Sequence, residues 1–454
     1  MSVETFASEY VTSSCQPSCP FVLGPFDNLV GPSIPIEVVY VYKIGFPATE
    51  LRLALNHLLT YYPQLTGRLS LNSNDEAYEI THFDQGMQFV EAKCSTPLSS
   101  FLPETSTPTV LDLPGQGCDL LPYFNNCYPN VLYEPIFGIQ HTTFSCGSVA
   151  LGVRLHHAVT DAYGLNLLMT HLSDLFRQHS LSVPSPTLSS PPIIQPFFPS
   201  TDIDPSYQPD LYSLPGEAPP AVPEVEAPNV PDHKVCGKII TVSEDQVLQL
   251  KKVVQGSDSS TSVSSFEALS TFFYKLIHQA RHQFFGPSQL SPPSFLTSVD
   301  CRSRLNPPLS SSYFHNAVLT ACMEMSTEEL LNESISNIAE KIHNVTRGDR
   351  LLPNEIEKTL QWINQTPSKR SIQLNFRFGN GSLLSSSWTR LSLFDTNFTC
   401  RPFIAGVPFT SGLTVDGLIY FLPNINNGVD VRLCLLEPVW EVLENMEEFK
   451  KVFG

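Results

Sequence analysis

The residues best suited to chemistry lie in one short segment, His156-His157-Ala158-Val159-Thr160-Asp161. An imidazole with an ordinary pKa of about 6.5 is largely neutral at pH 7, so it can accept a proton from a hydroxyl group. His157 is therefore a candidate general base. A histidine at the end of a strand also often has only a structural role, and the pattern HxxxD is too short to separate these interpretations.

Metal binding by His156, His157 and Asp161 is a third interpretation, and backbone geometry argues against it. Adjacent side chains on an extended backbone point to opposite faces, so the two histidines cannot easily share one ion. The 11 cysteines include no CxxC pair, and this spacing argues against both a zinc ribbon and a disulfide framework. We expect no metal site, and we expect free thiols in a reducing compartment.

The segments on either side of the histidines predict the elements that must position them. Apolar residues alternate through 148–155, which predicts a strand that ends at the two histidines. Leucines at helical spacing after Gly164 predict a helix directly behind Asp161. His157 would then lie on a loop fixed at both ends and could face a cleft. The strand residues predicted to share one face are Val149, Leu151, Val153 and Leu155.

Both halves of the chain mix helix and strand patterns, so we expect an α/β fold. Thr49 is available as the cap of a helix, and Asn427-Gly428 is a strong signal for a hairpin turn. The predicted elements are strands at 36–42, 417–421 and 429–435 and helices at 49–59 and 264–282.

A proline-rich stretch divides the chain. The 14 prolines between Pro184 and Pro231 exclude a helix or a central strand there. We expect domains at 1–183 and 233–454, joined by an extended crossover at 184–232. A loose surface insertion is the alternative for the middle of this stretch. Two domains also suit the length, since single cores rarely exceed about 250–300 residues.

Composition limits the partners of the protein. With 26 Lys and Arg against 44 Asp and Glu, the net charge is −18, which argues against binding to nucleic acid or to an anionic membrane. No apolar run approaches the roughly 18 residues of a membrane span. The opening MSVETFASEY lacks the basic and apolar regions of a secretory signal. We expect a cytoplasmic monomer whose partners are small molecules.

Four segments, taken in chain order, resemble the BAHD family of coenzyme A-dependent acyltransferases. The histidine segment is similar to the family's HHxxxDG, although Ala162 replaces the glycine. The stretch 300–316 is similar to DxRxRLxPPL…YFGN, with His315 where the family has glycine. Residues 386–391 resemble TSWxRL, and residues 61–69 resemble YPxLAGRL. One such match would be weak, but four in family order over nearly the whole chain are specific.

The resemblance implies two chloramphenicol-acetyltransferase-like α/β domains with an active-site channel at their interface. An acyl group, acetyl or larger, would pass from acyl-CoA to a hydroxyl, or less readily an amine, of a specialised metabolite. His157 would be the general base, with no covalent acyl-enzyme and no permanently bound cofactor. The Trp388 N–H, helped by the Ser386 hydroxyl, would stabilise the oxyanion. Ordinary core packing is the alternative role for Trp388.

The resemblance also implies roles around this centre. Asp161 would turn away from His157 and brace the loop by pairing with Arg302 or Arg304. The residues implied to face CoA are Ser264, Ser265, Ser387 and Thr389. CoA phosphates need local positive charge, and the lysines and arginines near Ser264 would supply it or would simply form a solvated helix face. These residues are Lys251, Lys252, Lys275 and Arg281.

The family's DFGWG signature is eroded in this chain. The corresponding segment 394–402 keeps Asp395 and Asn397 near the signature's acidic position, and we expect both to support the loop structurally. This erosion leaves open a catalytically weak protein that only binds acyl-CoA or a metabolite. A condensation-domain-like, amide-forming enzyme is a further alternative within the superfamily. His157 together with Trp388 argues against the first alternative, and the absence of a carrier domain weighs against the second.

Overall fold

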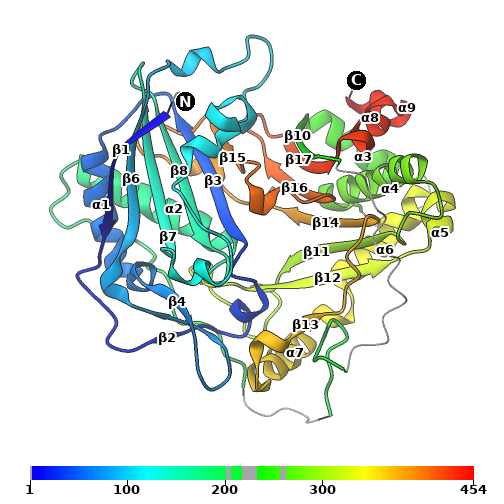
Figure 1. Ribbon diagram of the computed structural model, residues 1–454, viewed down its shortest axis with the longest axis horizontal. Helices are drawn as coiled ribbons and strands as arrows, with labels where there is room; N and C mark the ends of the chain where they lie inside the picture. The colour runs from blue at the N-terminus through cyan, green and yellow to red at the C-terminus, as the bar shows by residue number, and fades with distance from the viewer. Residues whose placement is uncertain (1–2, 201–205, 217–232, 256–261, 454) are drawn as a thin grey trace.

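The protein consists of two large sheets that lie beside each other, each with its own helices (Figure 1). The computed structural model describes residues 3–200, 206–216, 233–255 and 262–453. The first sheet takes its strands mainly from the N-terminal half of the chain, and the second takes its strands from the C-terminal half. The mixed α/β class with two packed units is therefore confirmed.

The first sheet has six strands in the order β1-β6-β7-β8-β3-β15. Only β6 and β7 run parallel, and the other neighbours are antiparallel. The strands span Val3–Val11 (β1), Pro35–Tyr42 (β3), Met87–Cys94 (β6), Phe137–Phe144 (β7), Val149–His156 (β8) and Ile404–Gly406 (β15). A smaller sheet beside it contains Phe21–Val22 (β2), Arg68–Leu71 (β4) and Tyr78–Thr81 (β5).

The core of this unit forms where the first sheet meets α1 (Ala48–Tyr61) and α2 (Ala162–Ser180). The four alternating residues of β8 all lie in this cluster, which confirms the predicted face: Val149, Leu151, Val153 and Leu155. The intervening Ala150 lies in a separate cluster with segments from 94–121. Because β8 is buried on both faces, its carboxyl end and the histidines that follow have a fixed position.

The second sheet has the strand order β10-β17-β16-β14-β11-β12. Its three neighbouring strands β11, β14 and β16 run parallel, so their carboxyl ends share one edge of the sheet. The strands span Val235–Val242 (β10), Ser294–Asp300 (β11), Val318–Glu324 (β12), Ser382–Ser387 (β14), Leu418–Pro423 (β16) and Val429–Leu436 (β17).

Helices of the second unit bury their apolar faces against this sheet and against each other. The long α4 contributes three of the six buried aromatic residues of that cluster, Phe272, Phe273 and Tyr274. The helices span Glu244–Gln255 (α3), Ser265–Phe285 (α4), Thr327–Asn332 (α5), Ile335–Arg347 (α6), Pro353–Gln365 (α7), Glu437–Asn445 (α8) and Glu447–Phe453 (α9).

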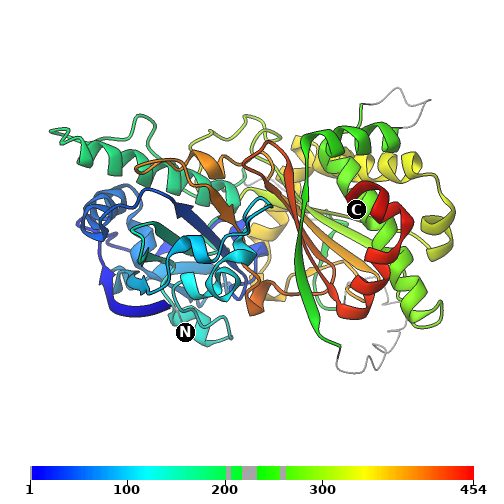
Figure 2. The ribbon, with the colours of Figure 1, turned by 90° about the horizontal axis from the view of Figure 1, so that it is seen from above.

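Two connections tie the units together. Within the proline-rich stretch, Ile193 forms an isolated bridge with Tyr313, and the Tyr313 hydroxyl accepts a hydrogen bond from the Phe197 N–H at 2.9 Å. Farther along, β9 (Tyr212–Ser213) pairs with β13 (Gln373–Leu374). Residues 201–205 and 217–232 of the predicted crossover lie outside the described residues. In the opposite direction, β15 joins the first sheet beside β3, and it appears as an orange strand within the blue unit in Figure 2.

Several local predictions can be compared with the structure. The hairpin at Asn427-Gly428 is confirmed, since β16 and β17 pair antiparallel across it and Asn427 has a φ of 62°. The helix at 264–282 is confirmed as α4. The prediction that Thr49 caps α1 is wrong, because the helix begins at Ala48 and its N-cap is Pro47, in extended conformation. All 11 cysteines are free. None of the described helices combines the length and apolar character needed to cross a membrane.

Candidate active site

The histidine loop runs from the end of β8 into the first turn of α2. Asp161 is the N-cap of this helix, and its Oδ1 accepts a hydrogen bond from the Gly164 N–H at 3.0 Å. A carboxylate at this position satisfies a free backbone donor and interacts favourably with the helix dipole. Ala162 is already the first helical residue, so the glycine that the family has there is not required for this backbone.

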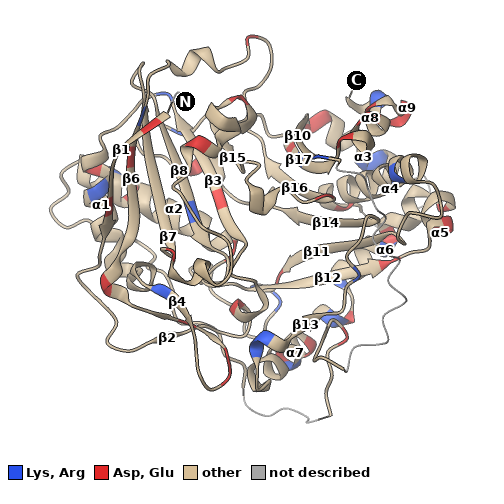
Figure 3. Ribbon diagram, in the orientation of Figure 1, with Lys and Arg blue, Asp and Glu red and all other residues tan. Residues whose placement is uncertain are grey.

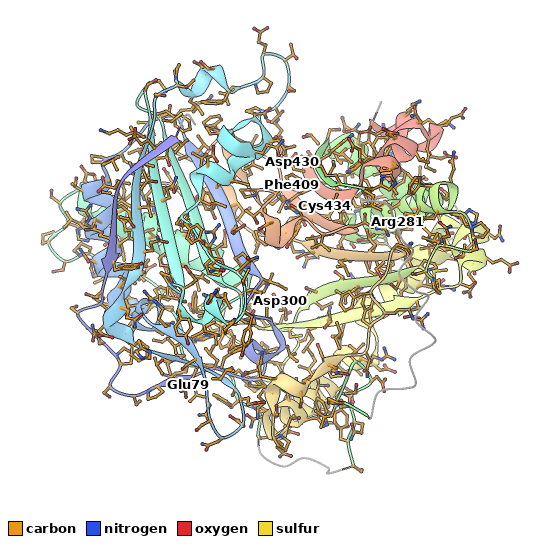
Figure 4. All side chains as sticks on the ribbon, viewed as in Figure 1. Glu79, Arg281, Asp300, Phe409, Asp430 and Cys434 are labelled. Carbon is orange, nitrogen blue, oxygen red and sulfur yellow. The ribbon has the colours of Figure 1, made fainter. Side chains whose placement is uncertain are left out.

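Asp161 forms a buried bidentate ion pair with Arg302, which follows β11 in the second unit. Both distances between guanidinium nitrogens and carboxylate oxygens are 2.9 Å, and Oδ2 also accepts from the Ala317 N–H at 3.0 Å. Burial raises the pKa of Asp161, but Arg302 and the N–H donors outweigh this effect and hold the pKa below its ordinary value. Figure 4 shows Asp300, the last residue of β11, at the end of the strand nearest the first sheet. The pair therefore connects the histidine loop to the second unit.

Arg304, the other arginine considered for this role, lies elsewhere. Its Nη2 donates to the Thr346 carbonyl on α6 at 2.9 Å. The structure thus places Arg302, and not Arg304, against Asp161.

His157 lies on this loop as a half-buried residue. Burial lowers its pKa below the ordinary value, which keeps the ring neutral at pH 7. Its Nδ1 atom is buried and has no hydrogen-bond partner among the described residues. A neutral imidazole with a hydrogen on Nδ1 presents the lone pair of Nε2, which is the form that can accept a proton.

His156 has a different environment. It is fully buried, its ring lies edge-on to Phe124 with centroids 5.0 Å apart, and burial lowers its pKa to about 3. Neither of its nitrogens has a partner within the described part of the chain. His156 therefore fills the core while His157 faces outward. Among the described residues, no group of three or more His, Cys, Asp or Glu side chains is arranged to hold a metal ion.

Trp388 directly follows β14 at the same edge of the second sheet from which Arg302 extends. Its backbone N–H donates to the Phe421 carbonyl at 2.8 Å, and its indole Nε1 donates to the Ser386 hydroxyl at 3.2 Å. The indole is buried in the cluster that also contains Ala158 and Val159 of the histidine loop. The hydroxyls of Ser387 and Thr389 lie 3.2 Å apart.

Ser264 and Ser265 lie at the N-terminus of α4. The Ser264 hydroxyl accepts from the Glu267 N–H at 3.2 Å, and Glu267 accepts from the Ser264 N–H at 2.7 Å, which forms a capping box. The next residue, Phe266, packs edge-on against Phe421, with centroids 6.1 Å apart. Phe421 is paired with Ser387 in the sheet, so the helix N-terminus and the end of β14 are close neighbours.

The cations near this helix differ in availability. Figure 3 shows basic residues on α3 and α4. Arg281 is buried and binds Asp416 and the Ser382 carbonyl, both at 2.7 Å, so it is a structural residue. Lys275 donates to the Glu333 carbonyl at 2.5 Å. Lys251 is half-buried and Lys252 is exposed at the end of α3.

Residues 394–402, which correspond to the eroded signature, pack against the first unit. Phe398 is buried and stacks on Phe46 with ring centroids 5.0 Å apart, and the Asn397 carbonyl accepts from Arg177 at 2.7 Å. Asp395 pairs with Arg401 at 3.1 Å, where both side chains are more than half exposed. An exposed pair contributes little stability, so apolar packing by Phe398 is the main anchor of this segment.

One residue of the site, Asp27, carries no signal in the sequence patterns. Asp27 lies in a short 3-10 turn before β3 and is fully buried; burial raises its pKa to about 7 against the opposing effect of its hydrogen bonds. Its Oδ1 accepts from the side-chain Nδ2 of Asn316 at 2.8 Å and from the Asn316 backbone N–H at 3.1 Å. Asn316 belongs to the segment that resembles YFGN, but its partner is 289 positions away. Neither periodicity nor a local pattern could connect them.

His315, which stands where the family has glycine, fills space beside the loop. Its Nδ1 lies 2.8 Å from the Val159 carbonyl and its Nε2 lies 2.9 Å from the Ile194 carbonyl. Burial lowers its pKa to about 4, so the ring is neutral at pH 7 and only one nitrogen donates.

Two helix-covered sheets with a histidine loop clamped between them define a two-domain protein of the chloramphenicol-acetyltransferase fold type. The model of the Transferase family matches residues 1–453, so the chain belongs to this family, the BAHD acyltransferases. It is a CoA-dependent acyltransferase that acts on hydroxyl or amine acceptors.

Relatives and solved structures agree with this assignment. The chain is 28% identical over 416 residues to shikimate O-hydroxycinnamoyltransferase of Nicotiana tabacum, covering 88% of each chain. It is 25% identical over 446 residues to a hydroxycinnamoyl-CoA:5-hydroxyanthranilate N-hydroxycinnamoyltransferase of Avena sativa, covering 94% of this chain and 93% of that protein. The crystal structure of F. graminearum TRI101 complexed with coenzyme A and T-2 mycotoxin has the same fold, with a TM-score of 0.75, 17% identity and coverage of 96% and 99%.

Proposed function

We propose that the protein transfers an acyl group from an acyl-CoA thioester to a hydroxyl group of a small specialised metabolite, with His157 as the general base. An amine is the less favoured acceptor. The observation that carries the proposal is the state of His157: a neutral imidazole on a loop that Asp161 and Arg302 hold against the second unit. A base with a lowered pKa is unprotonated at pH 7, as the reaction requires.

The reaction begins when Nε2 of His157 takes the proton of the acceptor hydroxyl. The acceptor oxygen then forms a bond to the thioester carbonyl carbon, and the carbonyl oxygen becomes an oxyanion. The Ser386 hydroxyl, which accepts from the Trp388 indole N–H, is the group proposed to donate to this charge at the edge of the second sheet. The tetrahedral intermediate collapses, the C–S bond breaks, and the CoA thiolate recovers the proton from the imidazolium. The products are the ester and free CoA, and no acyl-enzyme forms.

We further propose that CoA approaches along the N-terminus of α4. Ser264, Ser265, Ser387 and Thr389 would provide hydroxyl groups there, because Phe266 and Phe421 bring these segments together. Lys251 and Lys252 on α3 are the cations proposed to face the CoA phosphates.

A panel of acyl-CoAs tests the function directly. The purified protein is incubated with acetyl-CoA or hydroxycinnamoyl-CoAs and with candidate alcohols and amines, while thiol release and product masses are followed. Thiol release that requires an acceptor, with formation of the acylated product, is the expected result. Saturable binding of acyl-CoA without turnover for any acceptor would instead indicate a binding protein. Turnover with amines alone would favour the amide-forming alternative.

A further inference from the structure

A buried chain of hydrogen bonds reaches the backbone of His157 from the N-terminal segment. The amide nitrogen of Asn316 donates to Asp27 Oδ1 at 2.8 Å and to the His157 carbonyl at 2.9 Å. Asp27 is further held by the Gly24 N–H, which donates to its Oδ2 at 2.9 Å. Asp27 and Asn316 are almost completely buried, so water does not compete for these bonds.

The network fixes the orientation of the Asn316 amide. A carboxylate and a backbone carbonyl both accept hydrogen bonds, so the group facing them must be the NH₂ and not the oxygen. Both amide hydrogens are used. Asn316 Oδ1 is then directed elsewhere, and it is buried without a partner among the described residues, as is Nδ1 of His157. The Asn316 side chain also raises the pKa of His157, the effect expected of an acceptor facing the ring.

Two buried carboxylates thus hold consecutive residues beside the loop. Asp161 accepts from the Ala317 N–H at 3.0 Å, and Asp27 accepts from the Asn316 N–H at 3.1 Å. Of the two residues held in this way, only Asn316 forms a hydrogen bond with His157, through the His157 carbonyl.

Resting on the proposed function of His157, we propose that Asp27 is a positioning residue for acyl transfer: it holds the Asn316 amide, which in turn fixes the backbone of His157 and with it the position from which the ring extends. Asp27 contacts no reacting atom and acts only through Asn316. Small errors in the placement of a catalytic group reduce the chemical step steeply, by up to about 100-fold for 1 Å. The cost of losing Asp27 should therefore appear in kcat and not in KM.

The test compares Asp27→Ala, Asp27→Asn and Asn316→Ala. Asp27→Ala removes both carboxylate oxygens that accept from Asn316 and Gly24. It should lower kcat by about 10–100-fold and leave KM within about threefold of the wild-type value. Asp27→Asn keeps an oxygen facing Asn316 and should restore most of the activity. Asn28→Ala is the matched control, because Asn28 is buried in the same turn and binds Leu23, Gly24 and Tyr78 but not Asn316. It should lower the melting temperature and leave kcat unchanged.

A double-mutant cycle separates positioning from general destabilisation. If Asp27 acts through Asn316, then Asp27→Ala should cost nothing further in kcat once Asn316 is alanine. Multiplicative losses in the double variant would overturn the proposal, as would an unchanged kcat in Asp27→Ala. All rates are expressed per folded protein measured by circular dichroism.

A second readout does not depend on turnover. In ¹⁵N-histidine NMR spectra, assigned with His157→Gln, His157 should show the tautomer with its hydrogen on Nδ1. Asp27→Ala and Asn316→Ala should both shift its signals toward averaged tautomers, and Asn28→Ala should not. Unchanged His157 signals in Asp27→Ala would overturn the positioning role even if no acyl transfer is found. If the wild type shows no turnover but Asp27→Ala alters the His157 signals, the proposed function is refuted and the positioning role is retained.

Discussion

Replacing Asp161 with asparagine should destabilise the protein by about 3–5 kcal/mol, the usual cost of removing one partner from a buried ion pair. The side chains of Asp161 and Arg302 are only 5% and 6% exposed, so the arginine left behind cannot be hydrated freely. Asparagine has only one side-chain oxygen, so either the Ala317 N–H or the Gly164 N–H would face an NH₂ group in place of an acceptor. Activity should fall as well, because the loop that carries His157 loses its attachment to the second unit.

Asp300 provides the matched control. It binds the same guanidinium at 3.1 Å, but its side chain is 54% exposed. Asp300→Asn should therefore cost less than about 1 kcal/mol. Urea denaturation followed by intrinsic fluorescence measures both variants. Equal losses of folding stability in the two variants would refute the bracing role. An Asp161→Asn variant that is as stable as wild type but inactive would also refute it and would assign Asp161 to the chemistry.

The same pair predicts a dependence of stability on pH. The folded pKa of Asp161 is held below its unfolded value of about 3.9. Its stabilisation is therefore fully present above the unfolded pKa and disappears as the pH falls through the folded pKa. The stability difference between wild type and Asp161→Asn should be constant at neutral pH and should shrink only in acid. A difference that instead grows on acidification would contradict the assignment.

Other predictions concern the base and the segment that anchors the two units. Because burial lowers the pKa of His157 below its ordinary value of about 6.5, the acidic fall of kcat/KM that this residue causes should have its midpoint below pH 6.5; a midpoint above pH 7 would mean that another group limits the rate. Phe398→Ala should cost about 3–5 kcal/mol, since the ring is buried against Phe46 and Phe176. Asp395→Ala should cost less than about 1 kcal/mol, and a reversed order of these two losses in thermal or urea unfolding would show that the exposed pair holds the segment.

Much of the site followed from local patterns. The alternation of β8 and the leucine spacing of α2 required no knowledge of the rest of the chain, and together they placed His157 on a short loop between fixed elements. The end of α1 nearest β3 was predicted less well. Pro47 is the N-cap in an extended conformation, and the helix begins directly after it at Ala48, so Thr49 already lies inside the first turn.

The features that escaped prediction depend on contacts across the fold. Arg302 and Arg304 are two residues apart on the same turn, and only the three-dimensional path after β11 directs the first toward Asp161 and the second toward α6. Phe398 looks like one apolar residue in an irregular loop, yet it packs into the core of the opposite unit. Such long-range pairings leave no periodic signal in one sequence.

The most direct test of the account is the turnover of His157→Ala with an acyl-CoA and an acceptor that the wild type uses, measured beside His156→Ala. His157 is only half-buried, so the variant should fold normally and still bind acyl-CoA. Its kcat should fall by about 10²–10⁴, the usual contribution of a general base. His156→Ala should mainly reduce stability, because that ring is fully buried. A His157→Ala variant that retains wild-type kcat would contradict the central claim.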